Sequence, residues 1–105
     1  MTKPIRIEPE AAEELLQAAR WYQRRRPGLG SALLAAMGAA LELIQRHPDG
    51  GTQVPRVRNE VPARQLVVRR FPYAVVFLEL DTEIRILAFA HHSRRPTYWL
   101  DRLRR

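Results

Sequence analysis

Two segments in the first half of the chain repeat apolar residues at helical spacing. The first begins at Pro9, which suits the opening turn of a helix, and runs to about Gln23. Its apolar stripe comprises Ala11, Leu15, Ala18, Ala19 and Tyr22. The second begins near Leu29–Ser31, ends near Arg46, and carries Leu33, Met37, Ala40, Leu41 and Ile44. Because only a short Pro27-Gly28 break separates the two segments, they predict an antiparallel helical hairpin.

Alternating or β-branched segments predict four strands. The first is Lys3–Glu8, where Pro4 favours an edge position. The others lie in the second half, at Arg64–Arg70, Tyr73–Leu80 and Glu83–Ala90, and the last two are joined by an Asp81-Thr82 turn. The segment from Thr52 to Ala63, with Pro55 and Pro62, predicts a connecting loop with at most a short strand.

These elements predict one α+β domain over residues 1–105, in the order β-α-α-β-β-β. We expect the helical hairpin to pack on one face of a small antiparallel sheet. Pro96 can open a short terminal helix, from which Tyr98, Trp99 and Leu103 pack back on the domain.

Composition narrows the class of protein. The chain has no cysteine, so it depends on neither disulfides nor thiolate metal sites, and no apolar run is long enough to cross a membrane. We therefore expect a cytoplasmic protein with no membrane partner. The net charge is +7, of which residues 1–52 carry +1 and residues 53–105 carry +6. This distribution predicts that the sheet half attracts an anionic partner.

Most signatures of catalysis are missing from the sequence. Adjacent strand residues point to opposite faces, so His91 and His92 make a poor metal pair, and we expect neither a metal nor a cofactor. A metal-free ribonuclease needs proton carriers and cations that hold the scissile phosphate. His92, Tyr98 and Arg94 can supply these groups, together with Arg69 on a neighbouring strand. The structural alternative is that Tyr98 anchors the edge of the core.

Four segments together resemble toxins of the RelE/ParE superfamily, from bacterial type II toxin–antitoxin (plasmid stabilisation) modules. They are RRRPGLG, ALELIQRHP, RQLVVRRFPYAVVF and ILAFAHHSRRPTYW. The resemblance covers nearly the whole chain in the same β-α-α-β-β-β order. It implies a cytoplasmic toxin that is neutralised by a small antitoxin.

The superfamily divides by target, and the resemblance implies two candidate activities. RelE-like members cut messenger RNA on the ribosome, whereas ParE-like members inhibit DNA gyrase without cutting RNA. Tyr98 and His92 fall at nuclease positions, but Gln65, Val67 and Ala74 stand where cations are expected. The pattern therefore favours a ParE-like gyrase inhibitor that is not an enzyme. The alternatives are a RelE-like endoribonuclease and a non-toxic member that acts only as a binding domain.

The resemblance implies that the antitoxin wraps around the toxin. We expect the antitoxin to be acidic, because an acidic amphipathic segment complements an arginine-rich surface. The residues predicted to contact the antitoxin or the target are Arg64, Arg69, Arg70, Arg85, Arg94, Arg95, Tyr98 and Trp99.

Overall fold

The computed structural model describes residues 2–54 and 62–104, so most of the predicted loop, residues 55–61, lies outside the described residues. The helices are α1 (Pro9–Arg25) and α2 (Leu29–Arg46), followed near the C-terminus by the 3-10 helix η1 (Leu100–Arg104). The strands are β1 (Ile5–Ile7), β2 (Thr52–Gln53), β3 (Ala63–Val67), β4 (Tyr73–Glu79) and β5 (Ile84–His91). The predicted α+β class and element order are confirmed, with β2 as the short strand allowed in the loop.

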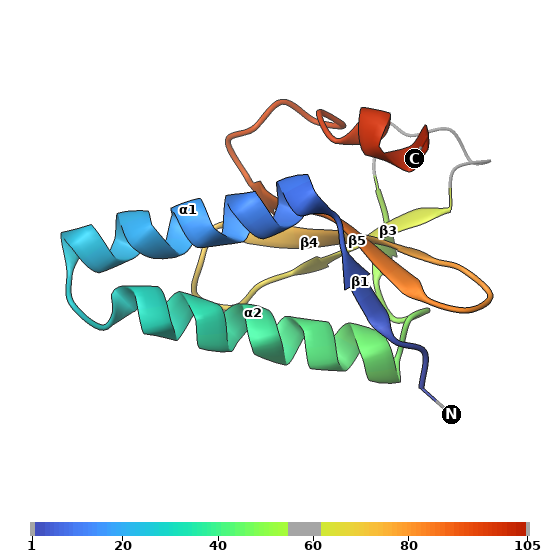
Figure 1. Ribbon diagram of the computed structural model, residues 1–105, viewed down its shortest axis with the longest axis horizontal. Helices are drawn as coiled ribbons and strands as arrows, with labels where there is room; N and C mark the ends of the chain where they lie inside the picture. Colours follow the sequence, from blue (N-terminus) through green and yellow to red (C-terminus); the bar gives the residue numbers. More distant parts are fainter. Residues whose placement is uncertain (1, 55–61, 105) are drawn as a thin grey trace.

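The five strands form one sheet in the order β1-β5-β4-β3-β2 (Figure 1). The pairs β2–β3, β3–β4 and β4–β5 are antiparallel, but β1 runs parallel to β5. The sheet is therefore mixed, and the prediction of an antiparallel sheet was wrong for its first strand. No hairpin joins β1 to β5, because nearly the whole chain lies between them, so adjacency does not require antiparallel pairing.

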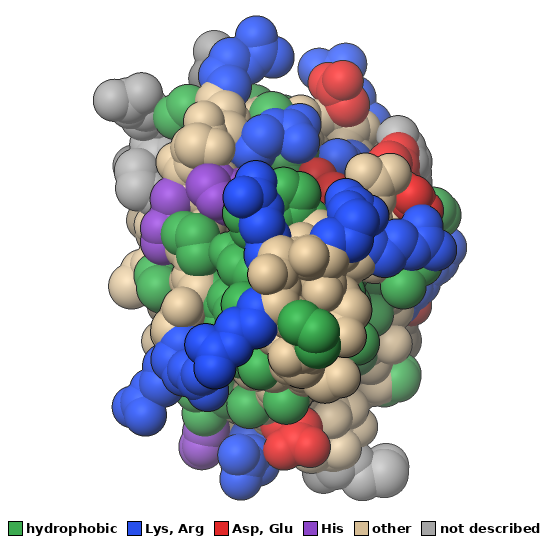
Figure 2. Space-filling model, turned by 90° about the vertical axis from the view of Figure 1, so that its left-hand side faces the viewer, with side chains coloured by type: hydrophobic (Ala, Val, Ile, Leu, Met, Phe, Trp, Pro, Cys, Tyr) green, Lys and Arg blue, Asp and Glu red, His purple; other side chains and the backbone are tan. Residues whose placement is uncertain are grey.

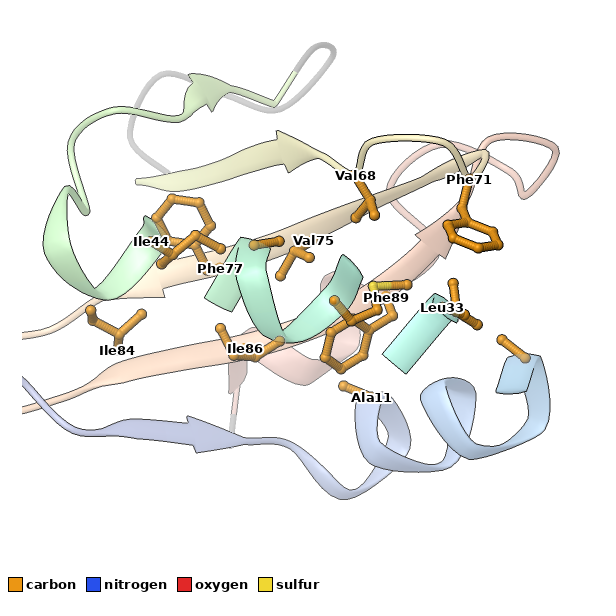
Figure 3. Packing of buried hydrophobic residues seen from close by; sticks show 13 residues of the cluster. Ala11, Leu33, Ile44, Val68, Phe71, Val75, Phe77, Ile84, Ile86 and Phe89 are labelled. Carbon is orange, nitrogen blue, oxygen red and sulfur yellow. The ribbon is translucent and has the colours of Figure 1, made fainter. Parts of the chain in front are cut away.

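The helical hairpin covers one face of the sheet and forms the main core (Figures 1 and 3). The predicted stripes face inward, and Ala11 and Leu33 are fully buried against Phe77, Ile86 and Phe89. The two helices approach closely at Gly30, where an added Cβ would lie 2.7 Å from the carbonyl oxygen of Ala19. Glycine at this position therefore lets the two helix backbones meet.

The opposite face of the sheet is covered by the C-terminal segment. A second cluster contains Val76, Leu78, Leu87 and Trp99, and Trp99 is only 3% exposed. The prediction that Trp99 and Leu103 pack back on the domain is confirmed, although the helical part is limited to η1. The sheet thus lies between the hairpin and the C-terminal segment.

A β-bulge in β5 determines which side chains reach each face. Val76 pairs with Ala88 and Phe77 pairs with Ile86, so Leu87 is an extra residue in β5. Ile84 and Ile86 face the helices before the bulge, and the odd-numbered Phe89 faces them after it. The bulge therefore changes which residues of β5 face the helices, from even-numbered ones before it to odd-numbered ones after it. The new alternation continues to the end of the strand at His91.

The strand predicted over Arg64–Arg70 ends at Val67, so Arg69 and Arg70 lie in the turn before β4. The amide of Val68 donates to the carbonyl of Tyr73, which closes this turn, and Val68 and Phe71 are buried beneath it. Arg70 has φ 72°, in the left-handed region that few residues other than glycine adopt. Both arginines are exposed at this turn.

Candidate functional site

A partly buried ionic cluster joins the C-terminal segment to helix α1. Arg102 donates from its two terminal nitrogens to the two carboxylate oxygens of Glu14, at 3.1 and 3.2 Å. The Tyr98 hydroxyl donates to the same carboxylate at 2.5 Å. Glu14 lies beyond the first turn of α1, so its charge serves these two partners and not the helix N-terminus.

The same cluster closes the free edge of β5 beyond the end of β1. Arg102 donates to the carbonyl of Leu87 at 2.8 Å, and the amide of Phe89 donates to Glu14 at 3.1 Å. These are backbone groups that a neighbouring strand would otherwise satisfy. Glu14 and Arg102 thus take the place of a strand at this edge.

Tyr98 is held in its protonated form by this environment. Burial raises the pKa of its phenol strongly, and the hydrogen bond to Glu14 raises it further. The Arg94 guanidinium lies over the ring, 4.0 Å from its centroid. Tyr98 is therefore an anchor of the C-terminal segment, which agrees with the structural alternative considered from the sequence.

A cleft of about 400 Å³ lies between the sheet and the C-terminal segment. We call it the tail cleft. It is lined by Val54, Gln65, Ala74, Val76, Ala90, His91, His92, Arg94, Arg95, Pro96, Thr97, Tyr98 and Trp99. The structure thus brings His92, Arg94, Arg95, Tyr98 and Trp99 together over a largely apolar floor.

The remaining predicted site residues lie elsewhere. Arg64 is half-buried and donates to the carbonyl of Gly51 at 2.8 Å, while Arg69 and Arg70 do not line the tail cleft. The prediction that Arg85 lies on a contact surface was wrong. It is 6% exposed, because it forms an ion pair with the buried Glu8 at 2.6 Å and donates to the carbonyl of Arg102. Trp99 is likewise buried, so it offers a partner little surface.

The fold also brings together arginines that lie far apart in the sequence and that the sequence analysis did not group. Figure 2 faces the end of the molecule where α1 joins α2, and many basic side chains lie there around hydrophobic and histidine surface. Three stretches that reach this end, 15–41, 62–78 and 84–100, contain no Asp or Glu. Three arginines from distant parts of the sequence lie beside neighbouring aromatic rings: Arg25 over Trp21, Arg70 over Phe71 and Arg94 over Tyr98. Trp21, Tyr22 and Tyr98 line one cleft, and Phe71 packs against Tyr22. We call these three arginines the arginine end.

Among residues 2–54 and 62–104, no group of three or more His, Cys, Asp or Glu side chains is placed to hold a metal ion. Within the same described part of the chain, no helix is long and apolar enough to span a membrane.

The Tyr98 anchor predicts a specific dependence of stability on pH. Tyr98→Phe removes a hydrogen bond to a charged group, so the free energy of unfolding at neutral pH should fall by about 1.5–3 kcal/mol. Because folding raises the pKa of this phenol, its contribution is present below pH 10 and is lost as the pH rises above 10. Urea unfolding at pH 8 and at about pH 11 should therefore show a larger alkaline loss for the wild-type protein than for the variant. Equal losses in the two proteins would contradict this role.

Comparisons with known proteins place the chain in a family. A comparison with curated proteins gives no match. Among solved structures, "Chromosomal ParDE TA system from P. aeruginosa" superposes with a TM-score of 0.72 at 19% sequence identity, covering 86% of this chain and 96% of that chain, which supports the fold. The sequence model of the family described as "ParE toxin of type II toxin-antitoxin system, parDE" matches residues 5–96. The chain therefore belongs to the ParE toxin family of type II toxin–antitoxin systems, with a cognate antitoxin as its partner, and the ParE-like branch favoured from the sequence is confirmed.

Proposed function

We propose that this ParE-family chain acts in the cytoplasm as an inhibitor of DNA gyrase, which it binds without cutting RNA. We further propose that an acidic segment of its antitoxin neutralises it by covering arginine-rich surface. Membership of the ParE family supports the toxin role, and the chemistry of the tail cleft supports binding over cleavage.

The observation that carries the proposal is the bond between Tyr98 and Glu14. Cutting RNA through its 2′-hydroxyl requires a base and an acid that exchange protons near neutral pH. The Tyr98 hydroxyl donates to Glu14 at 2.5 Å, and its pKa is raised well above its usual range. A phenol in this state is a poor proton carrier at neutral pH.

The cleft around Tyr98 also offers few groups that can hold a scissile phosphate. Its floor includes Ala74, Val76 and Ala90, and β3 contributes the neutral Gln65. The cations Arg94 and Arg95 come from the exposed segment that follows β5. An apolar floor beside a few charged groups is typical of a surface that binds a partner.

Gyrase inhibition and RNA cleavage can be measured in parallel. We expect purified toxin, free of antitoxin, to inhibit supercoiling of relaxed plasmid by gyrase. Primer extension on messenger RNA from cells that express the toxin should show no new 5′ ends. His92→Ala should likewise give no new 5′ ends, because His92 has no catalytic role in this proposal.

Two outcomes would overturn the proposal. Intact supercoiling at toxin doses that stop growth would exclude gyrase as the target. New 5′ ends that disappear in His92→Ala or Tyr98→Phe would assign the chain to the RelE-like activity instead.

The antitoxin interface can be tested through the exposed turn between β3 and β4. Neither Arg69 nor Arg70 has an ion-pair partner among the described residues, so an acidic segment can pair with both. We expect Arg69→Glu and Arg70→Glu each to weaken the toxin–antitoxin complex by roughly tenfold at low salt, with a smaller effect at high salt. Calorimetric titration at two salt concentrations measures both effects.

Arg46→Glu is the matched control, because Arg46 is exposed at the end of α2 and the substitution changes the charge equally. It should leave the affinity nearly unchanged. An equal loss of affinity in all three variants would show that the affinity depends only on the net charge of the toxin. That result would contradict a localised interface at Arg69 and Arg70.

A further inference from the structure

A second cleft of about 400 Å³ lies on the helix face of the sheet, between α1 and the ends of β4 and β5. We call it the helix cleft. Five aromatic side chains line it: Trp21, Tyr22, Tyr73, Phe89 and Tyr98. His91, Arg94 and Tyr98 line both clefts, so the end of β5 and the segment after it form the wall between them. The function proposed above makes no use of Trp21, Tyr22, Tyr73 or Phe89.

The aromatic rings are held by contacts with one another, and Trp21 remains open to solvent. Tyr22 packs edge-on against Trp21, with ring centroids 4.9 Å apart, and against Phe71 at 5.2 Å. Tyr73 packs edge-on against His91 at 5.0 Å. Trp21 is nevertheless 46% exposed, an unusual exposure for so large an apolar side chain. The cleft thus presents the Trp21 indole to solvent beside three half-buried tyrosines.

Polar groups stand at the edges of this aromatic surface. The amide of Ser93 donates to Nδ1 of His91 at 3.0 Å, so the proton of the neutral imidazole is on Nε2. The side chain of Gln17 lines the cleft and donates to Glu13 at 2.9 Å. A planar heterocycle with donors and acceptors along its edge finds complementary groups in His91 and Gln17.

Two arginines stand beside the aromatic rings. The Arg25 guanidinium lies 4.4 Å from the centroid of the Trp21 ring, and the Arg94 guanidinium lies 4.0 Å from that of Tyr98. Neither arginine has an acidic partner among the described residues. Of the acids in the cleft, Glu14 is neutralised by Arg102, and Glu13 lies more than two helical turns before Arg25. The arginine end therefore supplies free positive charge next to the cleft.

We infer that the helix cleft binds single-stranded nucleic acid, with a base among the aromatic side chains and the flanking phosphates on Arg25 and Arg94. Sites for single strands combine a stacking surface with cations that follow the backbone, and both features meet here. An acidic peptide would form ion pairs with the two arginines but would not stack on the exposed indole of Trp21. This binding requires no cleavage, and it stands independently of gyrase inhibition.

The test is fluorescence anisotropy with labelled ten-nucleotide oligomers of thymidine (DNA) and uridine (RNA), titrated with full-length toxin free of antitoxin. Trp21→Ala should weaken binding about five- to a hundredfold, the range expected from the loss of one base–aromatic stack. Arg94→Ala should weaken binding and make log Kd about 0.7 less steep against log salt, as for one lost phosphate contact. The DNA and RNA arms show which type of strand the cleft prefers.

Arg104→Ala and Leu43→Ala are the controls, because both residues are exposed and neither lines the helix cleft. Circular dichroism confirms that each variant is folded, and Trp21→Phe, which keeps an aromatic ring, should recover most of the affinity. Binding that is absent, or that Trp21→Ala affects no more than Arg104→Ala does, would overturn the inference. So would competition by a glutamate-rich peptide as strong as that by unlabelled oligomer, because the surface would then recognise charge alone.

Discussion

The position of the C-terminal segment, and with it the shape of both clefts, depends on the ion pair between Glu14 and Arg102. It joins the first helix to the last few residues of the chain, and it satisfies the backbone of β5 where β1 ends. Both side chains are mostly buried, with 16% and 12% of their surfaces exposed, so loss of either partner would leave a poorly solvated charge. A second pair, Glu8–Arg85, supports it, because Arg85 also holds the carbonyl of Arg102.

This constraint explains why the segment after β5 separates two clefts of different character. With Tyr98 tied to Glu14 and Trp99 buried under the sheet, the exposed residues 92–96 are fixed at both ends. The tail cleft on one side has an apolar floor, and the helix cleft on the other has aromatic walls. Tyr98, a group that a nuclease could use for proton transfer, is instead a structural anchor of the C-terminal segment.

The spacing of apolar residues was sufficient to predict the helices and strands whose buried faces recur at regular intervals. The two helices and the central strands were predicted to within a few residues, because their buried faces recur at regular spacing. The bulge at Leu87 was not predictable, since it lies in the continuous apolar run ILAFA, where every register looks alike.

The sequence was least informative about charged residues, whose roles depend on tertiary partners. Arg85 resembles a surface cation in the sequence, but buried Glu8 binds it across a separation of 77 residues. Glu14 lies beyond the first turn of α1, where its charge does not complement the helix dipole, and its partner Arg102 is 88 residues away in the sequence. The arginine end is visible only in three dimensions, because its members come from the last turn of α1, the turn between β3 and β4, and the segment after β5.

A double-mutant cycle tests the central claim most directly, with Glu14→Gln, Arg102→Gln and the double variant compared by urea unfolding. The Lys3–Glu79 pair gives the reference cycle, because its atoms are 2.9 Å apart but its side chains are 33% and 39% exposed. We predict a coupling free energy of about 1–3 kcal/mol between Glu14 and Arg102, and less than about 1 kcal/mol between Lys3 and Glu79. Additive effects of the Glu14 and Arg102 substitutions, within about 0.3 kcal/mol, would contradict the claim that this pair holds the C-terminal segment in place.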